Sequence, residues 1–78
     1  MEAQHSLDCL GLYCPMPIVK VAKKIKEIPV GDVLEVLADD QGFVDDLPSW
    51  CKMTGNECLG MEDAGGEIKV YVKKTRDT

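Results

Sequence analysis

The sequence has few of the residue types from which most catalytic and binding sites are built. Its single histidine, His5, provides neither a histidine-based catalytic triad nor a set of metal ligands. There is no glycine-rich phosphate loop, and every apolar run falls short of the ~18 residues needed to cross a membrane. Residues 1–9 contain neither a basic start nor an apolar stretch, so we expect no signal peptide and a cytoplasmic protein.

Net positive charge, which suits a protein to nucleic acid, is also missing. The 78 residues carry a formal charge of −5, and phosphate repels a chain of that sign. Lysine is nevertheless concentrated in one segment, because residues 17–28 contain four lysines and a single acidic residue. This local charge of +3 leaves −8 for the rest of the chain. The segment 17–28 is therefore the part of the protein whose charge suits an acidic partner surface.

The spacing of the four cysteines excludes the common cysteine frameworks. Structural zinc sites use close pairs such as C-x-x-C, and neither Cys9 with Cys14 nor Cys51 with Cys58 has that spacing. Without an export signal the thiols are expected to stay reduced, so two structural disulfides are not expected either. We therefore expect no bound metal, one reactive cysteine, and three cysteines that serve as small apolar side chains.

Apolar spacing and turn residues predict the first half of the fold. Residues 4–8 are predicted to form a short strand that is followed by a turn-rich connection. A helix comes next, because apolar residues recur at i, i+3, i+4 and i+7 through residues 18–28 until Pro29 and Gly31 end it. Apolar residues dominate the segment 32–38, which we expect to be a central strand buried on both faces.

A second helix is predicted after the acidic pair at positions 39–40. These side chains are suited to capping a helix, and capping explains the acidic residues better than a metal site does. The apolar stripe of the helix covers residues 43–54 and stops at Gly55. Because proline is poorly tolerated inside a helix, Pro48 predicts that the regular helix begins only near Asp46.

The chain is predicted to end in a hairpin. Strands at 57–62 and 68–73 flank the turn D-A-G-G at 63–66, and alternation in the last strand predicts one buried and one exposed face. The order is therefore β-α-β-α-β-β. We expect an α/β two-layer sandwich in which a four-stranded mixed sheet carries two helices on one face, as a single domain over residues 1–78.

Cys14 has the position in the sequence that favours a reactive thiol. It stands just before the lysine-bearing helix, whose N-terminus presents unpaired N–H groups and a partial positive charge that favour the thiolate. Pro15 and Pro17 lack N–H groups that a first helical turn leaves unpaired, and they stiffen the approach. Gly11 allows the chain to turn sharply off the first strand. The lysines predicted to form a docking face beside Cys14 are Lys20, Lys23 and Lys24.

The other cysteines and the lysines also have simpler interpretations. Cys51 lies on the apolar stripe of the second helix and is expected in the core, whereas Cys58 begins a strand and is ambiguous. Cys9 is close enough in sequence to act as a resolving thiol for Cys14, although a packed or solvated thiol explains it equally simply. The lysines suit either a docking role or an ordinary solvated helix face.

Three segments combine into a specific pattern. They are LDCLGLYCPMP at residues 7–17, GDVLEVLADD at residues 31–40 and D-x-P-x-W-C at residues 46–51. Together they resemble the TusA/SirA-like family of small sulfur-carrier proteins over nearly the whole chain, from Leu7 to the final strand. The resemblance implies the same β-α-β-α-β-β two-layer fold, and it implies that the cysteine of the C-P-x-P element, Cys14, carries sulfur as a persulfide.

The resemblance also implies partner proteins rather than a cofactor. Members of the family receive sulfur from a cysteine desulfurase or a rhodanese-like donor and pass it to acceptors in tRNA thiolation, molybdenum-cofactor or sulfur metabolism. We therefore expect a monomeric carrier with no cofactor that binds a donor and an acceptor protein and neither membrane nor nucleic acid. Two other functions stay open. A thiol-disulfide protein would pair Cys14 with Cys9, and a regulatory or nucleic-acid-binding module would use the lysine face.

Overall fold

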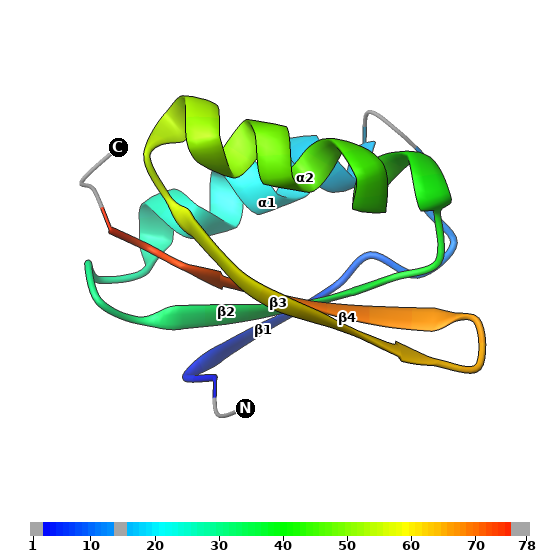
Figure 1. The fold of residues 1–78 in the computed structure, drawn as a ribbon. Helices are drawn as coiled ribbons and strands as arrows, with labels where there is room; N and C mark the ends of the chain where they lie inside the picture. The colour runs from blue at the N-terminus through cyan, green and yellow to red at the C-terminus, as the bar shows by residue number, and fades with distance from the viewer. Residues whose placement is uncertain (1–2, 14–15, 76–78) are drawn as a thin grey trace.

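The computed structural model describes residues 3–13 and 16–75, in which four strands form one sheet with two helices on one of its faces (Figure 1). The sheet has the order β1-β2-β4-β3, with β1 parallel to β2 and the other neighbours antiparallel. This is the predicted two-layer sandwich with a mixed sheet. In chain order the elements are β1 (His5–Asp8), α1 (Met16–Glu27), β2 (Val33–Ala38), α2 (Gln41–Thr54), β3 (Glu57–Ala64) and β4 (Glu67–Lys73).

The core lies between the helices and the inner face of the sheet. Apolar side chains of α1 and α2 meet the inward-facing residues of β2 and β4, so the helical stripes predicted from spacing are confirmed. Within the described residues no helix is both long and apolar enough to span a membrane. The largest fully buried members of this core are Phe43, Ile25, Leu34, Leu47, Val21, Val36, Val70 and Val72.

β2 is central, between β1 and β4, but it is buried on one face only. Alternate residues from Leu34 to Ala38 are completely buried against the helices, whereas Val33, Glu35 and Leu37 are half-buried. The prediction of burial on both faces is therefore wrong. The apolar run reflects the interior position of the strand in the sheet, and among the described residues both helices lie on the other face.

α2 begins at Gln41, because Asp40 caps it. The Oδ2 atom of Asp40 accepts a hydrogen bond from the backbone N–H of Phe43 at 3.1 Å, which is the contact expected of an N-cap aspartate. The helix ends at Gly55, whose φ of 83° is the left-handed conformation that glycine adopts without strain. Both ends of α2 are thus closed by residues that the sequence offers for that purpose.

Pro48 lies inside α2, so the prediction that the regular helix starts only near Asp46 is wrong. Proline removes one intrahelical hydrogen bond and costs about 3 kcal/mol relative to alanine in a helix interior. The two turns around it bury Phe43 and Leu47 completely, and full burial of such a side chain is worth about 1.5–3 kcal/mol. The packing of this face against the sheet therefore offsets the cost of the proline.

The β3–β4 hairpin is longer than the sequence predicts. β3 continues through Ala64, and the chain reverses at Gly65 and Gly66, whose φ angles of 68° and 100° suit a two-residue hairpin turn. Tyr71, expected on an exposed face of β4, is only 4% exposed and donates a hydrogen bond to Glu62. Because β4 has a neighbouring strand on each side, flanking side chains cover this ring even without a second layer.

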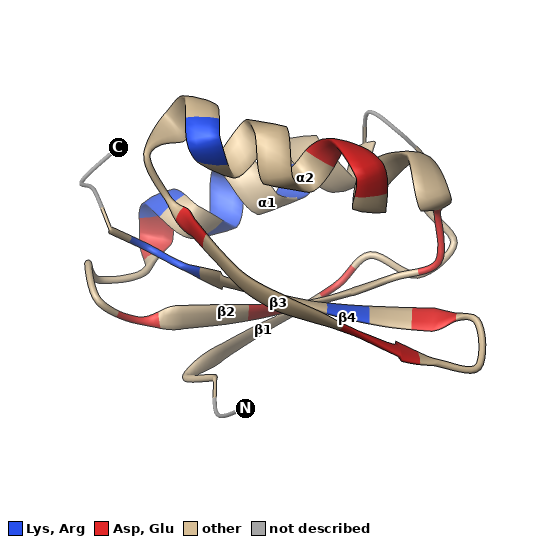
Figure 2. Cartoon of the chain, viewed as in Figure 1, with Lys and Arg blue, Asp and Glu red and all other residues tan. Residues whose placement is uncertain are grey.

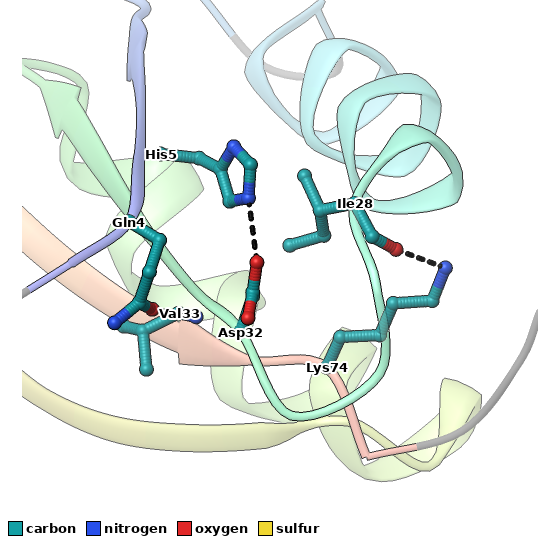
Figure 3. A network of polar contacts seen from close by, with 6 residues as sticks. All are labelled: Gln4, His5, Ile28, Asp32, Val33 and Lys74. Carbon is teal, nitrogen blue, oxygen red and sulfur yellow. Dashed lines mark hydrogen bonds and ion pairs between the residues drawn. The ribbon is translucent and has the colours of Figure 1, made fainter.

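A polar network closes the end of the sheet where β1 begins (Figure 3). The Nε2 atom of His5 lies 2.9 Å from the Oδ2 atom of Asp32, in the loop before β2. The side chain of Lys74 is buried and donates to the backbone oxygen of Ile28, just beyond the C-terminus of α1, at 2.8 Å. The network therefore ties the first strand, the α1–β2 connection and the end of β4 together.

Candidate functional site

The connection between β1 and α1 carries the predicted site. Cys14 and Pro15 lie outside the described residues, so the structure locates the residues on either side of them. The side chains of Tyr13 and Met16 are 74% and 48% exposed, and the N–H of Met16 donates to the backbone oxygen of Tyr13 at 2.9 Å. The Cys14–Pro15 pair thus lies in the sequence between two exposed residues whose backbones are hydrogen-bonded to each other.

Backbone contacts hold the first part of this connection against the sheet. The N–H of Cys9 donates to the backbone oxygen of Leu37 at 2.8 Å, which continues the β1–β2 pairing by one residue. Gly11 then adopts a φ of 78°, so the sharp turn predicted from this glycine is confirmed. Its N–H lies 3.1 Å from both carboxylate oxygens of Asp39, which follows β2. The loop before Cys14 is therefore fixed to the end of β2.

α1 begins at Met16, so the positive end of the helix lies immediately after the C-P pair. Pro17 is the second residue of the helix and is buried, at a position where the missing N–H leaves no acceptor unsatisfied. The first turn contains no acidic residue, so no side chain of that turn neutralises the partial positive charge of the helix N-terminus. This local field favours an anion at the start of α1.

The three lysines predicted to form a docking face have different surroundings. Lys20 and Lys23 are exposed, whereas Lys24 is half-buried in the last turn of α1, where a positive charge stabilises the helix. Lys20 is close enough to the Cys9 thiol to lower its pKa, against the larger effect of burial. Figure 2 shows lysines along α1 and acidic residues in the first half of α2.

The three described cysteines are free thiols with raised pKa values. Burial raises the pKa of Cys9, whose side chain is completely inaccessible. Burial, with a smaller effect of the neighbouring Cys58, raises the pKa of Cys51 to about 12. Burial also raises the pKa of Cys58, although hydrogen bonds from Gly60 and Cys51 oppose it. Because the thiolate is the nucleophile, none of the three is activated at neutral pH.

These environments decide between several readings of the cysteines. Cys51 is 2% exposed, which confirms that it belongs to the core. The complete burial of Cys9 disfavours a resolving thiol, because exchange requires access to the sulfur. Cys58 is half-buried, at the edge of the core.

The two acidic residues after β2, Asp39 and Asp40, have different structural roles. Asp40 caps α2, as the sequence predicts, whereas Asp39 binds the backbone of the loop before Cys14. Sequence reasoning missed this second task, since its only signal was an aspartate directly after a strand. Throughout residues 3–13 and 16–75, no three side chains of the His, Cys, Asp and Glu types gather into a group that could hold a metal ion.

Small two-layer sandwiches with a C-P-x-P element at the start of the first helix form one class of protein. Comparison with known proteins identifies the family within this class. A family model described as Sulfurtransferase TusA matches residues 5–74. The crystal structure of the SirA-like protein from Desulfitobacterium hafniense matches with a TM-score of 0.81 and 26% identity, covering 94% of this chain and 100% of the other. The chain belongs to the TusA family.

This chain matches nearly the full length of some similar proteins but less than half of another. YrkF of Bacillus subtilis is 46% identical over 74 residues, which are 95% of this chain and 40% of that protein. YrkI of the same organism is 40% identical and is covered to 99%, again with 95% of this chain. The sulfur carrier protein TusA of Allochromatium vinosum is 39% identical over 95% of this chain and 97% of its own length.

Proposed function

We propose that this protein is a sulfur carrier that holds sulfur as a persulfide on Cys14 and relays it from a donor protein to an acceptor protein. The observation that carries the proposal is the C-P-x-P element at the start of α1 in a chain of the TusA family. The relative from Allochromatium vinosum is itself named a sulfur carrier protein. We further propose that the whole chain, residues 1–78, acts as one monomeric carrier domain.

The electrostatics at the start of α1 support an anionic sulfur at Cys14. The helix begins two residues after Cys14, its first N–H groups have no intrahelical partners, and its first turn contains no acid. Such a position lowers the pKa of a cysteine and stabilises a thiolate. A persulfide anion carries the same charge on the outer sulfur and benefits in the same way. The exposed Lys20 adds a positive charge one turn further along the helix.

Sulfur transfer through Cys14 needs only two nucleophilic displacements. The Cys14 thiolate attacks the outer sulfur of a persulfide on the donor, a new S–S bond forms, and the donor cysteine leaves as a thiolate. A thiolate or other nucleophile on the acceptor then attacks the outer sulfur on Cys14, and the Cys14 thiolate leaves. No electrons are gained or lost overall, so the carrier requires no cofactor.

The surroundings of the site support a protein partner at each step. Tyr13, Met16 and Val19 are large apolar side chains with exposed fractions of 74%, 48% and 38%, and they lie on the connection and the first turn of α1. The exposed lysines 20 and 23 lie on the same helix. Apolar anchors beside positive charge suit an acidic partner surface. We propose a cysteine desulfurase or a rhodanese-like protein as the donor, with an acceptor in tRNA thiolation or another sulfur pathway.

Loading by a purified cysteine desulfurase tests the proposal. Incubated with the desulfurase and cysteine, the protein should gain one sulfur atom that a thiol reductant removes. Peptide mapping by mass spectrometry should locate the sulfur on Cys14. A Cys14→Ser variant should stay unmodified, whereas Cys58→Ser, which keeps the C-P-x-P element, should load normally. Loading of the Cys14→Ser variant to the wild-type level would overturn the proposal.

A further inference from the structure

Tyr13, the residue directly before Cys14, is an aromatic side chain that the fold leaves largely in water. The chain contains four aromatic residues, of which Phe43 is completely buried, Tyr71 is 4% exposed and Trp50 is half-buried. The side chain of Tyr13 is instead 74% exposed. Because burial in the core is what an aromatic ring contributes to folding, the ring of Tyr13 adds little to the stability of the chain.

Tyr13 belongs to a local concentration of exposed apolar side chains. Single apolar residues on a surface are ordinary, whereas several of them together mark an interaction site. Among the described residues six large apolar side chains are exposed, and three of these, Tyr13, Met16 and Val19, lie within residues 13–19. The other three are scattered over the α1–β2 connection, the last turn of α2 and β3. The exposed apolar surface is therefore concentrated in the segment that contains Cys14.

The backbone on either side of Tyr13 is fixed. Leu12 is half-buried and packs against the core, and its N–H donates to the backbone oxygen of Cys9 at 3.2 Å. The backbone oxygen of Tyr13 accepts the N–H of Met16 at 2.9 Å. A tyrosine side chain also has few rotatable bonds, so little conformational entropy is lost when a partner buries the ring.

The exposed side of α1 continues this surface and changes from apolar to basic along the helix. Met16, Val19, Lys20 and Lys23 have the i, i+3, i+4, i+7 spacing that places residues on one side of a helix, and all four are exposed. Apolar groups at the centre of a contact provide most of its affinity, whereas charges at the rim attract the partner from a distance. The segment 13–23 therefore combines an apolar centre with a basic rim.

We propose that Tyr13 is the anchor by which the sulfur-donating protein recognises this carrier, and that its ring enters an apolar pocket beside the reactive cysteine of that donor. The proposal rests on the sulfur-carrier function and adds the residue that selects the donor. Consecutive Cα atoms are about 3.8 Å apart, so docking of the ring also brings Cys14 to the pocket. We expect an acceptor for the phenol O–H inside the pocket, because buried hydroxyl groups retain a hydrogen bond.

Tyr13 acts in binding and takes no part in the bond changes. Displacement of one thiolate by another at sulfur requires no proton from a phenol. Binding that is equally strong before and during the transfer affects the KM for the carrier and leaves kcat unchanged. A residue that merely held Cys14 in place would instead lower kcat or the intrinsic reactivity of the thiol. The two roles are therefore separable by kinetics.

Loading by a purified cysteine desulfurase, measured at a series of carrier concentrations, tests the proposal. Tyr13→Ala should raise the KM for the carrier by at least about tenfold and leave kcat near that of wild type. Tyr13→Phe, which keeps the ring, should raise the KM much less. Met53→Ala truncates an 80% exposed side chain in the last turn of α2 and is the matched control, for which both constants should be unchanged.

Two further measurements separate donor recognition from other roles of the ring. Inorganic polysulfide gives up one sulfur atom to a thiolate and leaves one sulfur shorter, and it needs no docking surface. Cys14 in Tyr13→Ala should therefore gain sulfur from polysulfide at the wild-type rate, as followed by peptide mapping. Gel filtration of wild type should show a monomer, because the ring is proposed to bind a donor and not a second copy of the chain.

The possible results distinguish this inference from the proposed function. Equal KM values for Tyr13→Ala and wild type would overturn the inference and leave Cys14 as the carrier. Slow polysulfide loading of Tyr13→Ala would also overturn it, since the ring would then act on the thiol. A wild-type dimer that Tyr13→Ala converts to a monomer would assign the ring to a contact between two copies. Failure of wild type to gain sulfur on Cys14 would overturn the proposed function, and this inference with it.

Discussion

The carboxylate of Asp39 accepts the backbone N–H of Gly11, with both of its oxygens 3.1 Å from the nitrogen. The two residues are 28 positions apart, one on the loop before Cys14 and the other directly after β2. Gly11 is in the left-handed conformation there, which orients its N–H toward the carboxylate. This contact connects the end of the central strand to the part of the chain that presents the C-P-x-P element.

Removing the Asp39 carboxylate should loosen this loop. We expect Asp39→Ala to lower the free energy of unfolding by about 1 kcal/mol, the usual net contribution of one hydrogen bond, and to slow sulfur loading several-fold. Asp39→Asn keeps an acceptor and should lose less. Urea unfolding and desulfurase loading measure the two effects. Asp45→Ala, which removes an exposed carboxylate of α2, is the control, and an equal effect there would show that the Gly11 contact is unimportant.

Replacing the proline inside α2 should stabilise the protein. Pro48→Ala restores an N–H that can bond to the backbone oxygen of Val44. Part of this gain is offset because alanine leaves the unfolded chain more flexible than proline does. We therefore expect the free energy of unfolding to rise by about 1–2 kcal/mol. Thermal unfolding measures the gain. Pro29→Ala, outside both helices, should instead be neutral or slightly destabilising. A lower melting temperature for Pro48→Ala would contradict this account.

Local signals were sufficient to predict the architecture. The spacing of residues such as Val21 and Ile25 specifies which side of α1 is buried, and that choice depends on neighbours three and four positions away. Gly55 and the Gly65–Gly66 pair mark chain reversals because their positive φ angles are costly for other residues. With four strands and two helices in 78 residues, one helical layer on one face of the sheet is the natural arrangement.

Features that depend on tertiary contacts could not be predicted in this way. The start of α2 is set by the burial of Phe43, which outweighs the proline eight residues into the helix. The Asp39–Gly11 contact joins segments that come together only when β1 pairs with β2. The position of Cys58 depends on a bulge, which has no signature in the sequence apart from a glycine two residues later.

Reversing the charge of the exposed lysines should slow sulfur transfer without unfolding the protein. For Lys20→Glu combined with Lys23→Glu we expect slower loading and a melting temperature near that of wild type, because exposed charges contribute about 0–1 kcal/mol. High salt should slow wild-type loading as well, since the screening length falls from about 10 Å at 0.1 M to about 3 Å at 1 M.

Lys52→Glu, at the exposed C-terminal turn of α2, provides the matched control and should load at the wild-type rate. If the α1 variant also loads normally, these lysines form an ordinary solvated face. That outcome would leave the role of Cys14 unaffected.

The buried thiol of Cys51 should make stability depend on alkaline pH. Burial raises its pKa from 9.0 to about 12, so the unfolded chain releases this proton at lower pH than the folded protein does. The stabilisation is complete below pH 9 and is lost as the pH rises toward 12. The free energy of unfolding should therefore fall with pH more steeply for wild type than for Cys51→Ala, by up to about 1.4 kcal/mol per pH unit.

Denaturant unfolding at a series of pH values between about 8 and about 10.5 measures this difference. Val44→Ala truncates another buried side chain of α2 that cannot ionise, so it should lower stability equally at every pH. Parallel curves for wild type and Cys51→Ala would show that Cys51 ionises equally easily in both states.

The row of paired residues His5, Leu34 and Val72 crosses the sheet where β1 starts and β4 finishes. The chain accordingly enters β1 and leaves β4 at the same end of the sheet, and α1 begins at the opposite end (Figure 1). Another folded module attached to either terminus would extend away from Met16 and leave the approach to α1 open. This geometry makes the fold a modular unit, suited to being joined in tandem with other domains, and it recommends terminal tags over internal labels for experiments on sulfur transfer.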